Sequence, residues 1–306
     1  MRLALFTSVL AVAAAAALSP VAEARPAPAR AAAAIDLATP DGGITAMRKI
    51  WCTMTDGEPV VWYWKGEVFS RKVGEPDKKL FNVEGINVRA CGKVNDPKRG
   101  AGVRSVSREI LLYLDPKTDQ VLSKWNNPWT GQTVDVLHVA NDPVNGEFWP
   151  VNRDGTPFKF GGDIIADKWF LTSTIPLFYK NPLAGEYQDE AGGQYHATEM
   201  FNFMGQATDL TDPKVNSADA KIGWVRISDF LPWMKMGSRE GVLYFHTAGA
   251  KLRNWDAVSE TMKSEVAKYY PEYRTPPPLD DKRPNETSWT YYKKVRDGVI
   301  KAPQRP

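Results

Sequence analysis

Hydrophobic and polar positions alternate along the middle of the chain with the two-residue period of β-strands. The alternation runs from Pro59 to Thr247 and is interrupted by short polar stretches. Because successive side chains of a strand point to opposite faces, the pattern predicts antiparallel strands. The clearest examples are VVWYWKGEVFS, REILLYLD, TVDVLHVAN, YHATEMFNFM and VLYFHTAG. The intervening segments DPKTD (115–119) and NRDGTP (152–157) are typical of hairpin turns.

Two segments follow helical spacing instead. Apolar residues of GITAMRKIWCTM (43–54) share one face, which predicts a short amphipathic helix before the first strand. A second helix is predicted after Asn254, which can cap it, and it should end at Pro271. The stretch that follows (275–294) is rich in proline and aromatic residues, so we expect it to dock on the body of the protein.

The number and spacing of the strands indicate a mainly β fold. We predict a single antiparallel β-barrel of the lipocalin type, closed or nearly closed, over residues 42–295, flanked by an N-terminal and a C-terminal helix. Closure would remove exposed strand edges and leave room for one small ligand. A two-sheet β-sandwich is the alternative. Strands and helices do not alternate and no repeat is present, which argues against a parallel sheet or a solenoid.

The first 24 residues are typical of a secretory signal peptide. Arg2 precedes an apolar run, and Ala22-Glu23-Ala24 matches the small-residue pattern of a cleavage site. We therefore expect a periplasmic or secreted protein whose mature chain starts at Arg25. The apolar run is too short for a transmembrane anchor. Residues 25–41 are predicted to form a flexible linker, and residues 296–306 a C-terminal tail.

Composition and charge narrow the class of partner. Hydrophobic residues make up 43% of the chain and the net charge is +3, so a real core is possible but no strong field for nucleic acid or anionic membrane exists. A hydrophobic small molecule is the expected partner, and no integral membrane segment is expected. The only two cysteines, Cys52 and Cys91, could form one disulfide in an exported protein, although their spacing does not decide it.

One candidate for chemistry is the histidine in TVDVLHVAND. Alternation puts His138 on the same face as Asp142, with Asn141 on the other face. The segment breaks before Pro143, and loops at strand ends often carry ligand-contacting residues. The alternative is structural: an interior histidine with satisfied hydrogen bonds, followed by a turn before proline.

The second candidate lies in YHATEMFNFM. As a strand, this segment places His196 and Asn202 on one face and Glu199 among aromatic residues on the other. A carboxylate surrounded by aromatic side chains holds its proton more tightly, which tunes it for acid/base work near neutral pH. The alternative, equally compatible with the sequence, is a buried ion pair of Glu199 with Arg89 or Arg226.

Standard nucleophile and cofactor motifs are absent. Neither G-x-S-x-G nor S-x-x-K occurs, and no glycine-rich nucleotide loop is present. His246 lies on an apolar strand face, and three histidines with a carboxylate could in principle hold zinc or iron. No metal-binding spacing such as H-E-x-x-H supports such a site. We therefore expect neither a metal nor a cofactor.

Aromatic residues are the other positive feature of the sequence. Most of them should fill the core, because large aromatic side chains dominate burial. A minority would line an apolar pocket in which a few polar groups orient the ligand. The candidate substrate-binding residues are Trp62, Trp64, Arg89, Asn141, Asn202, Tyr244 and His246.

Four segments carry a resemblance to a known family. NPWTGQTVDVLHVANDPVN, YHATEMFNFM, LPWMKMG and NETSWTYYKK resemble the secreted bacterial proteins grouped as domain-of-unknown-function family 1838. The resemblance covers roughly residues 42–295. It implies an exported single-domain protein and carries no established activity or catalytic residues.

The sequence thus favours cofactor-free acid/base chemistry of the lyase or isomerase type on a hydrophobic small molecule. The residues expected to transfer protons are His138, Asp142, His196 and Glu199. A carrier that binds the same kind of ligand without catalysis is the main alternative. A metal-dependent enzyme is the third, and the fold alone does not distinguish the three.

Overall fold

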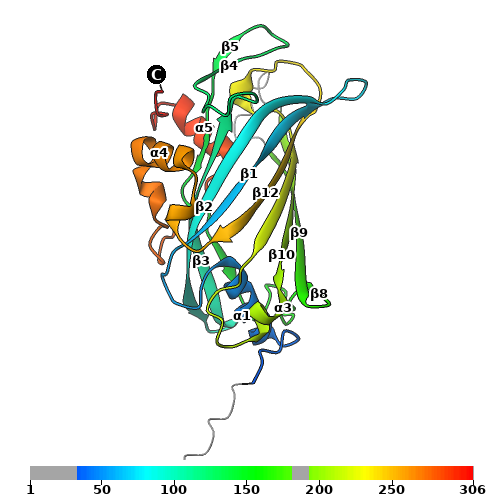
Figure 1. Ribbon diagram of the computed structural model, residues 1–306, viewed down its shortest axis with the longest axis vertical. Helices are drawn as coiled ribbons and strands as arrows, with labels where there is room; N and C mark the ends of the chain where they lie inside the picture. The colour runs from blue at the N-terminus through cyan, green and yellow to red at the C-terminus, as the bar shows by residue number, and fades with distance from the viewer. Residues whose placement is uncertain (1–32, 181–192, 306) are drawn as a thin grey trace, which may run out of the picture. The chain divides into compact units, whose positions relative to one another are not determined.

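The computed structural model describes residues 33–180 and 193–305, and its dominant feature is one long antiparallel sheet (Figure 1). The predicted signal peptide, 1–24, lies outside the described residues. The long strands are β1 (Val60–Arg71), β2 (Lys78–Asp96), β3 (Gly100–Leu114), β9 (Lys168–Lys180), β10 (Gln194–Gln206), β11 (Lys221–Ser228) and β12 (Val242–Leu252). The short strands are β4 (Lys124–Asn126), β5 (Thr133–Asp135), β6 (Val139–Asn141), β7 (Gly146–Phe148) and β8 (Asp163–Ile165).

The sheet is open, so the prediction of a closed barrel was wrong. Its ten strands run in the order β6-β3-β2-β1-β12-β11-β10-β9-β8, with β7 also on β3, and no described pairing joins β6 to β8. The segment expected to supply one strand over 133–141 is instead split into β5 and β6, and β5 pairs only with β4. The chain between β3 and β9 therefore offers only three-residue strands, too short to bridge the two edges. One continuous sheet also differs from the two-sheet sandwich.

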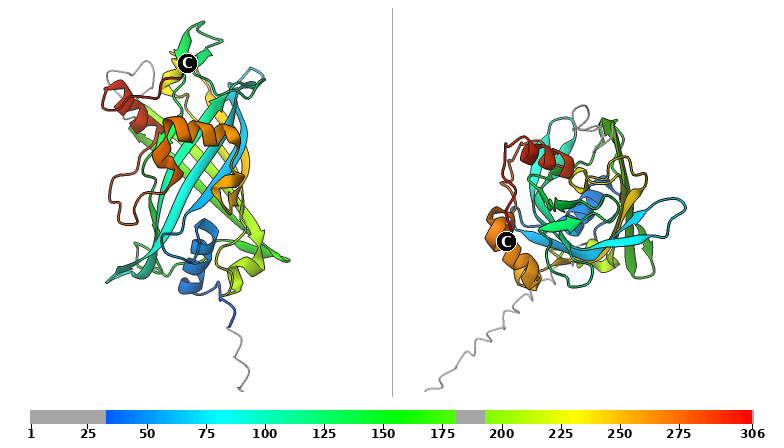
Figure 2. Two further views of the ribbon diagram at one scale, coloured as in Figure 1. Left: turned by 60° about the vertical axis from the view of Figure 1, so that its left-hand side comes forward. Right: turned by 90° about the horizontal axis from the view of Figure 1, so that it is seen from above.

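The sheet is nevertheless strongly curved. Trp62 of β1 and Phe203 of β10 have ring centroids 5.5 Å apart, although β12 and β11 lie between their strands. Trp51, at the end of α1 (Pro40–Trp51), contacts both rings, at 6.1 and 5.1 Å. The helix therefore sits within the curve, where Figure 2 shows it from above. This confirms a helix before the first strand, although it begins within the expected linker.

The end of α1 is fixed to the sheet in two ways. Cys52, its C-cap, forms a disulfide with Cys91 of β2, so the bridge left undecided by the sequence is present. Lys251 of β12 donates from Nζ to the carbonyl oxygens of Lys49, Ile50 and Cys52, at 2.6, 2.9 and 3.1 Å. These are carbonyls that a helix end leaves without internal partners.

The convex face of β1, β2 and β3 is covered by the C-terminal part of the chain (Figure 2). The cover consists of η2 (Trp255–Ala257), α4 (Glu260–Tyr269) and η3 (Pro271–Arg274). The single helix predicted from Asn254 is interrupted, because Val258 is extended and Ser259 caps α4 anew. Met262 and Val266 of α4 pack with Ile86 and Ile110 of the sheet.

Helix α5 (Ser288–Arg296) packs between β6, at one edge of the sheet, and β10, near the other edge. It packs against β6 on one side, and on the other its Trp289 contacts Tyr195 of β10, with ring centroids 4.8 Å apart. The proline-rich stretch before it hydrogen-bonds to the loop after β6, for example from the Asn145 N–H to Asn285 at 2.7 Å. Side-chain packing through α5 thus links β6 with β10, and the expectation that this stretch docks is confirmed.

Candidate functional site

Four charged side chains lie on the concave side of the sheet. Arg89 and Glu109 come from the neighbouring strands β2 and β3, whereas Glu199 and Arg226 come from β10 and β11. Alternation places each of them on the face that also carries Trp62 and Phe203. Curvature of the sheet brings the two pairs into electrostatic contact, because the charges of Glu199 and Arg226 act on Glu109.

On one side of this cluster, Glu199 and Arg226 form an ion pair. Arg226 Nη1 lies 2.9 Å from Glu199 Oε1, and its Nη2 donates to the Tyr195 hydroxyl. The side chains of Glu199 and Arg226 are 19% and 14% exposed to solvent. Opposite Glu199 in β9, Ile175 is 41% exposed. The ion pair is therefore held by the sheet but still reached by solvent from the β9 side.

On the other side, amide side chains hold Glu109 and Arg89. Asn141 Nδ2 donates to Glu109 Oε1 at 3.4 Å, and Arg89 Nε donates to Asn87 Oδ1 at 3.1 Å. The Arg89 guanidinium also stacks over the ring of Trp51, 4.2 Å from its centroid. These contacts fix the orientation of both groups without giving Glu109 a direct ion-pair partner among the described residues.

The electrostatics of Glu109 set it apart from the other carboxylates. Burial and the nearby negative charge of Glu199 raise its pKa, while Arg226, Arg89 and a hydrogen bond from Asn87 lower it, and the net pKa is about 7. Burial also lowers the pKa of Arg89, to about 10. A carboxyl group with a pKa near neutrality exchanges its proton readily in both directions at physiological pH.

Aromatic rings continue the concave surface beside the ion pair. The rings of Trp64 and Phe201 lie 6.2 and 6.4 Å from that of Trp224, centroid to centroid. The indole Nε1 atoms of Trp64 and Trp224 and the Nε of Arg226 are buried and have no hydrogen-bond partner among the described residues. Buried donors of this kind are normally satisfied, so they favour a bound polar group or water nearby.

Comparison with known families connects this fold to an uncharacterised group. Residues 57–296 match the family described as protein of unknown function DUF1838. The chain belongs to the DUF1838 family. No curated protein matches it.

In this DUF1838 protein, His138 is buried and both of its ring nitrogens form hydrogen bonds with the backbone, as expected for a histidine with a structural role. Its side chain is 1% exposed, and Nδ1 accepts a hydrogen bond from the Tyr113 backbone N–H at 3.0 Å. Nε2 therefore carries the hydrogen and donates to the Leu122 carbonyl oxygen, also at 3.0 Å. Burial, together with the positive charge of Arg305, lowers the pKa of His138 to about 3, so the ring is neutral near pH 7.

The other predicted residues of the DUF1838 protein divide between the two faces of the sheet. Asp142 lies away from His138's ring nitrogens, in ion pairs with Arg283 at 2.7 Å and Arg108 at 3.1 Å. The convex face carries His196, Asn202, Tyr244 and His246, and the concave face carries Trp62, Trp64, Arg89, Asn141 and Glu199. The structure thus places Glu199 on the same face as Arg89 and Asn141, and on the opposite face from His196 and His246.

Within residues 33–180 and 193–305, no three metal-ligating side chains gather into a group. In the same part of the chain, no helix has both the length and the apolar character to cross a membrane.

The ion pair of Glu199 with Arg226, one of the two alternatives for this glutamate, is confirmed.

Sequence reasoning missed Glu109 and Tyr195 as members of the cluster in this DUF1838 protein. Glu109 lies in REILLYLD, where the residues on both faces are mostly apolar because β3 is covered on both sides. The available signal was alternation, which puts Glu109 on the same face as Leu111 and Tyr113. A carboxylate in a strand that is otherwise buried on that face is unusual enough to mark it.

Proposed function

We propose that the protein catalyses cofactor-free acid/base chemistry, of the lyase or isomerase type, on a hydrophobic small molecule bound against the aromatic residues of the concave face. Glu109 would transfer the proton. Glu199 and Arg226 would position the substrate and balance the charge that develops on it. This assigns proton transfer to Glu109 rather than to His138, Asp142 and His196, and it makes Glu199 a positioning residue.

The observation that carries the proposal is the pKa of Glu109, about 7, in a cluster that also holds two guanidinium groups. In an isomerisation, the ionised carboxylate would remove a proton from a carbon next to a carbonyl group. The electron pair would move onto the carbonyl oxygen, where Arg226 Nε or an indole N–H could donate to it. The protonated Glu109 would then return the proton to a different carbon, so that protons and charges balance.

A carrier function remains the second candidate, and one observation favours it. Glu199 is already neutralised by Arg226, and the rings of Trp64, Trp224 and Phe201 form an apolar surface that needs no reaction to explain it. A carrier would return its ligand chemically unchanged after any length of incubation. An enzyme would convert it.

We also propose that the protein is exported, as expected for secreted bacterial members of the family. The predicted signal peptide supports this, and so does the Cys52–Cys91 disulfide, because such bonds persist mainly in oxidising compartments. Expression of the full chain followed by mass spectrometry of the exported product should give a mass that starts at Arg25. Retention of Met1 in a cytoplasmic product would contradict export.

The function is tested on the mature chain, purified from Arg25 onward. Native mass spectrometry should find a co-purifying apolar compound, and fresh wild-type protein should convert that compound to a second species. Glu109→Gln should still bind the compound but fail to convert it. Glu260→Gln, which alters a glutamate whose side chain is 88% exposed on α4, should behave as wild type. Recovery of unchanged compound with all three proteins would establish the carrier instead.

A further inference from the structure

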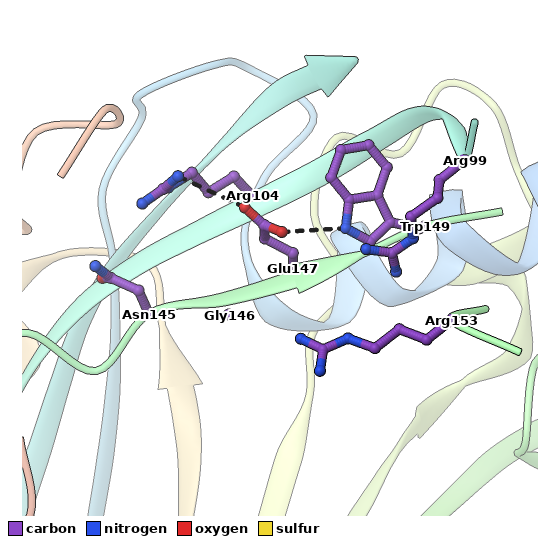
Figure 3. A pocket seen from close by; sticks show the side chains of 7 residues that line it. All are labelled: Arg99, Arg104, Asn145, Gly146, Glu147, Trp149 and Arg153. Carbon is purple, nitrogen blue, oxygen red and sulfur yellow. Dashed lines mark hydrogen bonds and ion pairs between the residues drawn. The ribbon is translucent and has the colours of Figure 1, made fainter. Parts of the chain in front are cut away.

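A second polar pocket lies on the opposite side of β3 from Glu109. It has a volume of about 290 Å³, and it is lined by Arg99, Arg104, Asn145, Gly146, Glu147, Trp149 and Arg153 (Figure 3). Arg104 belongs to β3 and Glu147 to β7, which pair directly. Because Arg104 and Glu109 are five residues apart in one strand, they face opposite sides. The pocket is therefore separate from the concave cluster.

Three guanidinium groups line this pocket against one carboxylate. Arg104 lies 3.5 Å from Glu147, whose other oxygen accepts a hydrogen bond from the Trp149 indole at 3.2 Å. Arg99 stacks over Trp149, 4.7 Å from its ring centroid, and donates from Nε to the Val151 carbonyl oxygen at 3.2 Å. The single carboxylate is thus already used by two partners, which leaves excess positive charge.

Two of the arginines have donors that no described residue satisfies. The Nε of Arg104 is buried without a partner, although its Nη2 donates to the Asp281 carbonyl oxygen. Arg153 is exposed, and no hydrogen bond or ion pair to it is present among the described residues. Figure 3 shows its side chain extending alongside β7 below Glu147. A guanidinium group with free donors is suited to oxyanions, which can accept two parallel N–H bonds from it.

The size of the pocket limits what it can hold. The pocket volume lies at the lower end of the range for small-molecule sites, about 300 Å³ and upward. The available room therefore fits an oxyanion together with a small attached group.

We propose that this pocket binds a tetrahedral oxyanion of the phosphate or sulfate class, as a free ion or as the charged group of a small ester. Arg153 supplies the free guanidinium, and Arg104 and Arg99 contribute positive charge from positions fixed by Glu147 and by Trp149. The site does not depend on the function proposed for the concave cluster.

The test is calorimetric titration of the mature protein with inorganic phosphate, inorganic sulfate and phenyl phosphate, each at an ionic strength matched with sodium chloride. Wild-type protein should give saturable binding with one site. Arg153→Gln should weaken it about tenfold, as expected for loss of one charge-assisted contact worth about 1.4 kcal/mol. Arg253→Gln, at an exposed position elsewhere, should leave it unchanged.

The arms of the titration distinguish the sources of the anion. Tighter binding of phenyl phosphate than of inorganic phosphate would identify an ester as the ligand, and equal binding would identify the free ion. The proposal is overturned if no titrant shows saturable binding, or if Arg153→Gln binds as wild type does. The comparison of Arg153→Gln with Arg253→Gln decides the outcome.

Discussion

The raised pKa of Glu109 makes a prediction about stability that does not require a known substrate. Replacing Glu109 by Gln keeps the shape of the protonated side chain and removes its ability to ionise. In the wild type, the pKa rises from an ordinary 4.5 in the unfolded chain to about 7 in the folded protein. Between these values, the folded state holds a proton that the unfolded state has lost. The contribution of Glu109 to the free energy of unfolding of the wild type is therefore fully present below pH 4.5, and it is lost as the pH rises through 7.

The size of the effect follows from the same shift. A difference of about 2.5 pKa units corresponds to at most about 3 kcal/mol, and the partial exposure of Glu109 reduces this to about 1–3 kcal/mol. Relative to wild type, Glu109→Gln should thus gain about 1–3 kcal/mol of unfolding free energy between pH 5 and pH 8. The measurement is urea unfolding followed by tryptophan fluorescence at several pH values, with the disulfide kept oxidised.

Glu260→Gln is the matched control, because it removes a carboxylate that is almost fully exposed on α4. Its difference from wild type should stay constant across the same pH range. If the difference between Glu109→Gln and wild type were also independent of pH, Glu109 would have an ordinary titration, and the proton-transfer role proposed for it would lose its physical basis.

Three further predictions concern the scaffold. Arg226→Met should lower the free energy of unfolding in urea at pH 7 by about 1–2 kcal/mol, because Glu199 would lose its partner in a half-buried site. The double variant with Glu199→Gln should recover most of that loss, and no recovery would contradict the pairing. Replacing Cys52 and Cys91 by Ala should cost about 4 kcal/mol for a 39-residue separation, and an unchanged midpoint would mean that the bridge is absent. In the wild type, stability falls as the pH is lowered from 6.5 to about 3, because His138 takes up a proton in the unfolded chain but not in the folded protein. His138→Asn should reduce this loss of stability, and an acid transition equal to that of wild type would refute this.

Local patterns predicted the faces of individual strands well. The alternation in YHATEMFNFM separated Glu199 from His196 and placed it among aromatic residues, as the structure has it. The end of the helix before Pro271 was also visible, but Asn254 caps only η2, and the extended conformation of Val258, after which Ser259 caps α4, has no strong local signal.

The long-range features could not be predicted in the same way. Contact between Glu109 and the ion pair of Glu199 with Arg226 depends on curvature that brings β3 opposite β11 across three intervening strands. Failure of the sheet to close depends on the break at His138, whose two ring hydrogen bonds hold the chain between β5 and β6. Both outcomes are set by tertiary packing, which overrides the local period.

The most direct test of the central claim is solvent deuterium incorporation into the compound that co-purifies with the protein. The compound is incubated in deuterated buffer at neutral pH with wild type, Glu109→Gln or Glu260→Gln, and is then examined by mass spectrometry and NMR. Proton transfer by Glu109 predicts deuterium at one carbon position with wild type and Glu260→Gln, and at least a hundredfold slower incorporation with Glu109→Gln, in line with loss of a general base. Equal incorporation by wild type and Glu109→Gln, or none by either, would contradict proton transfer by Glu109.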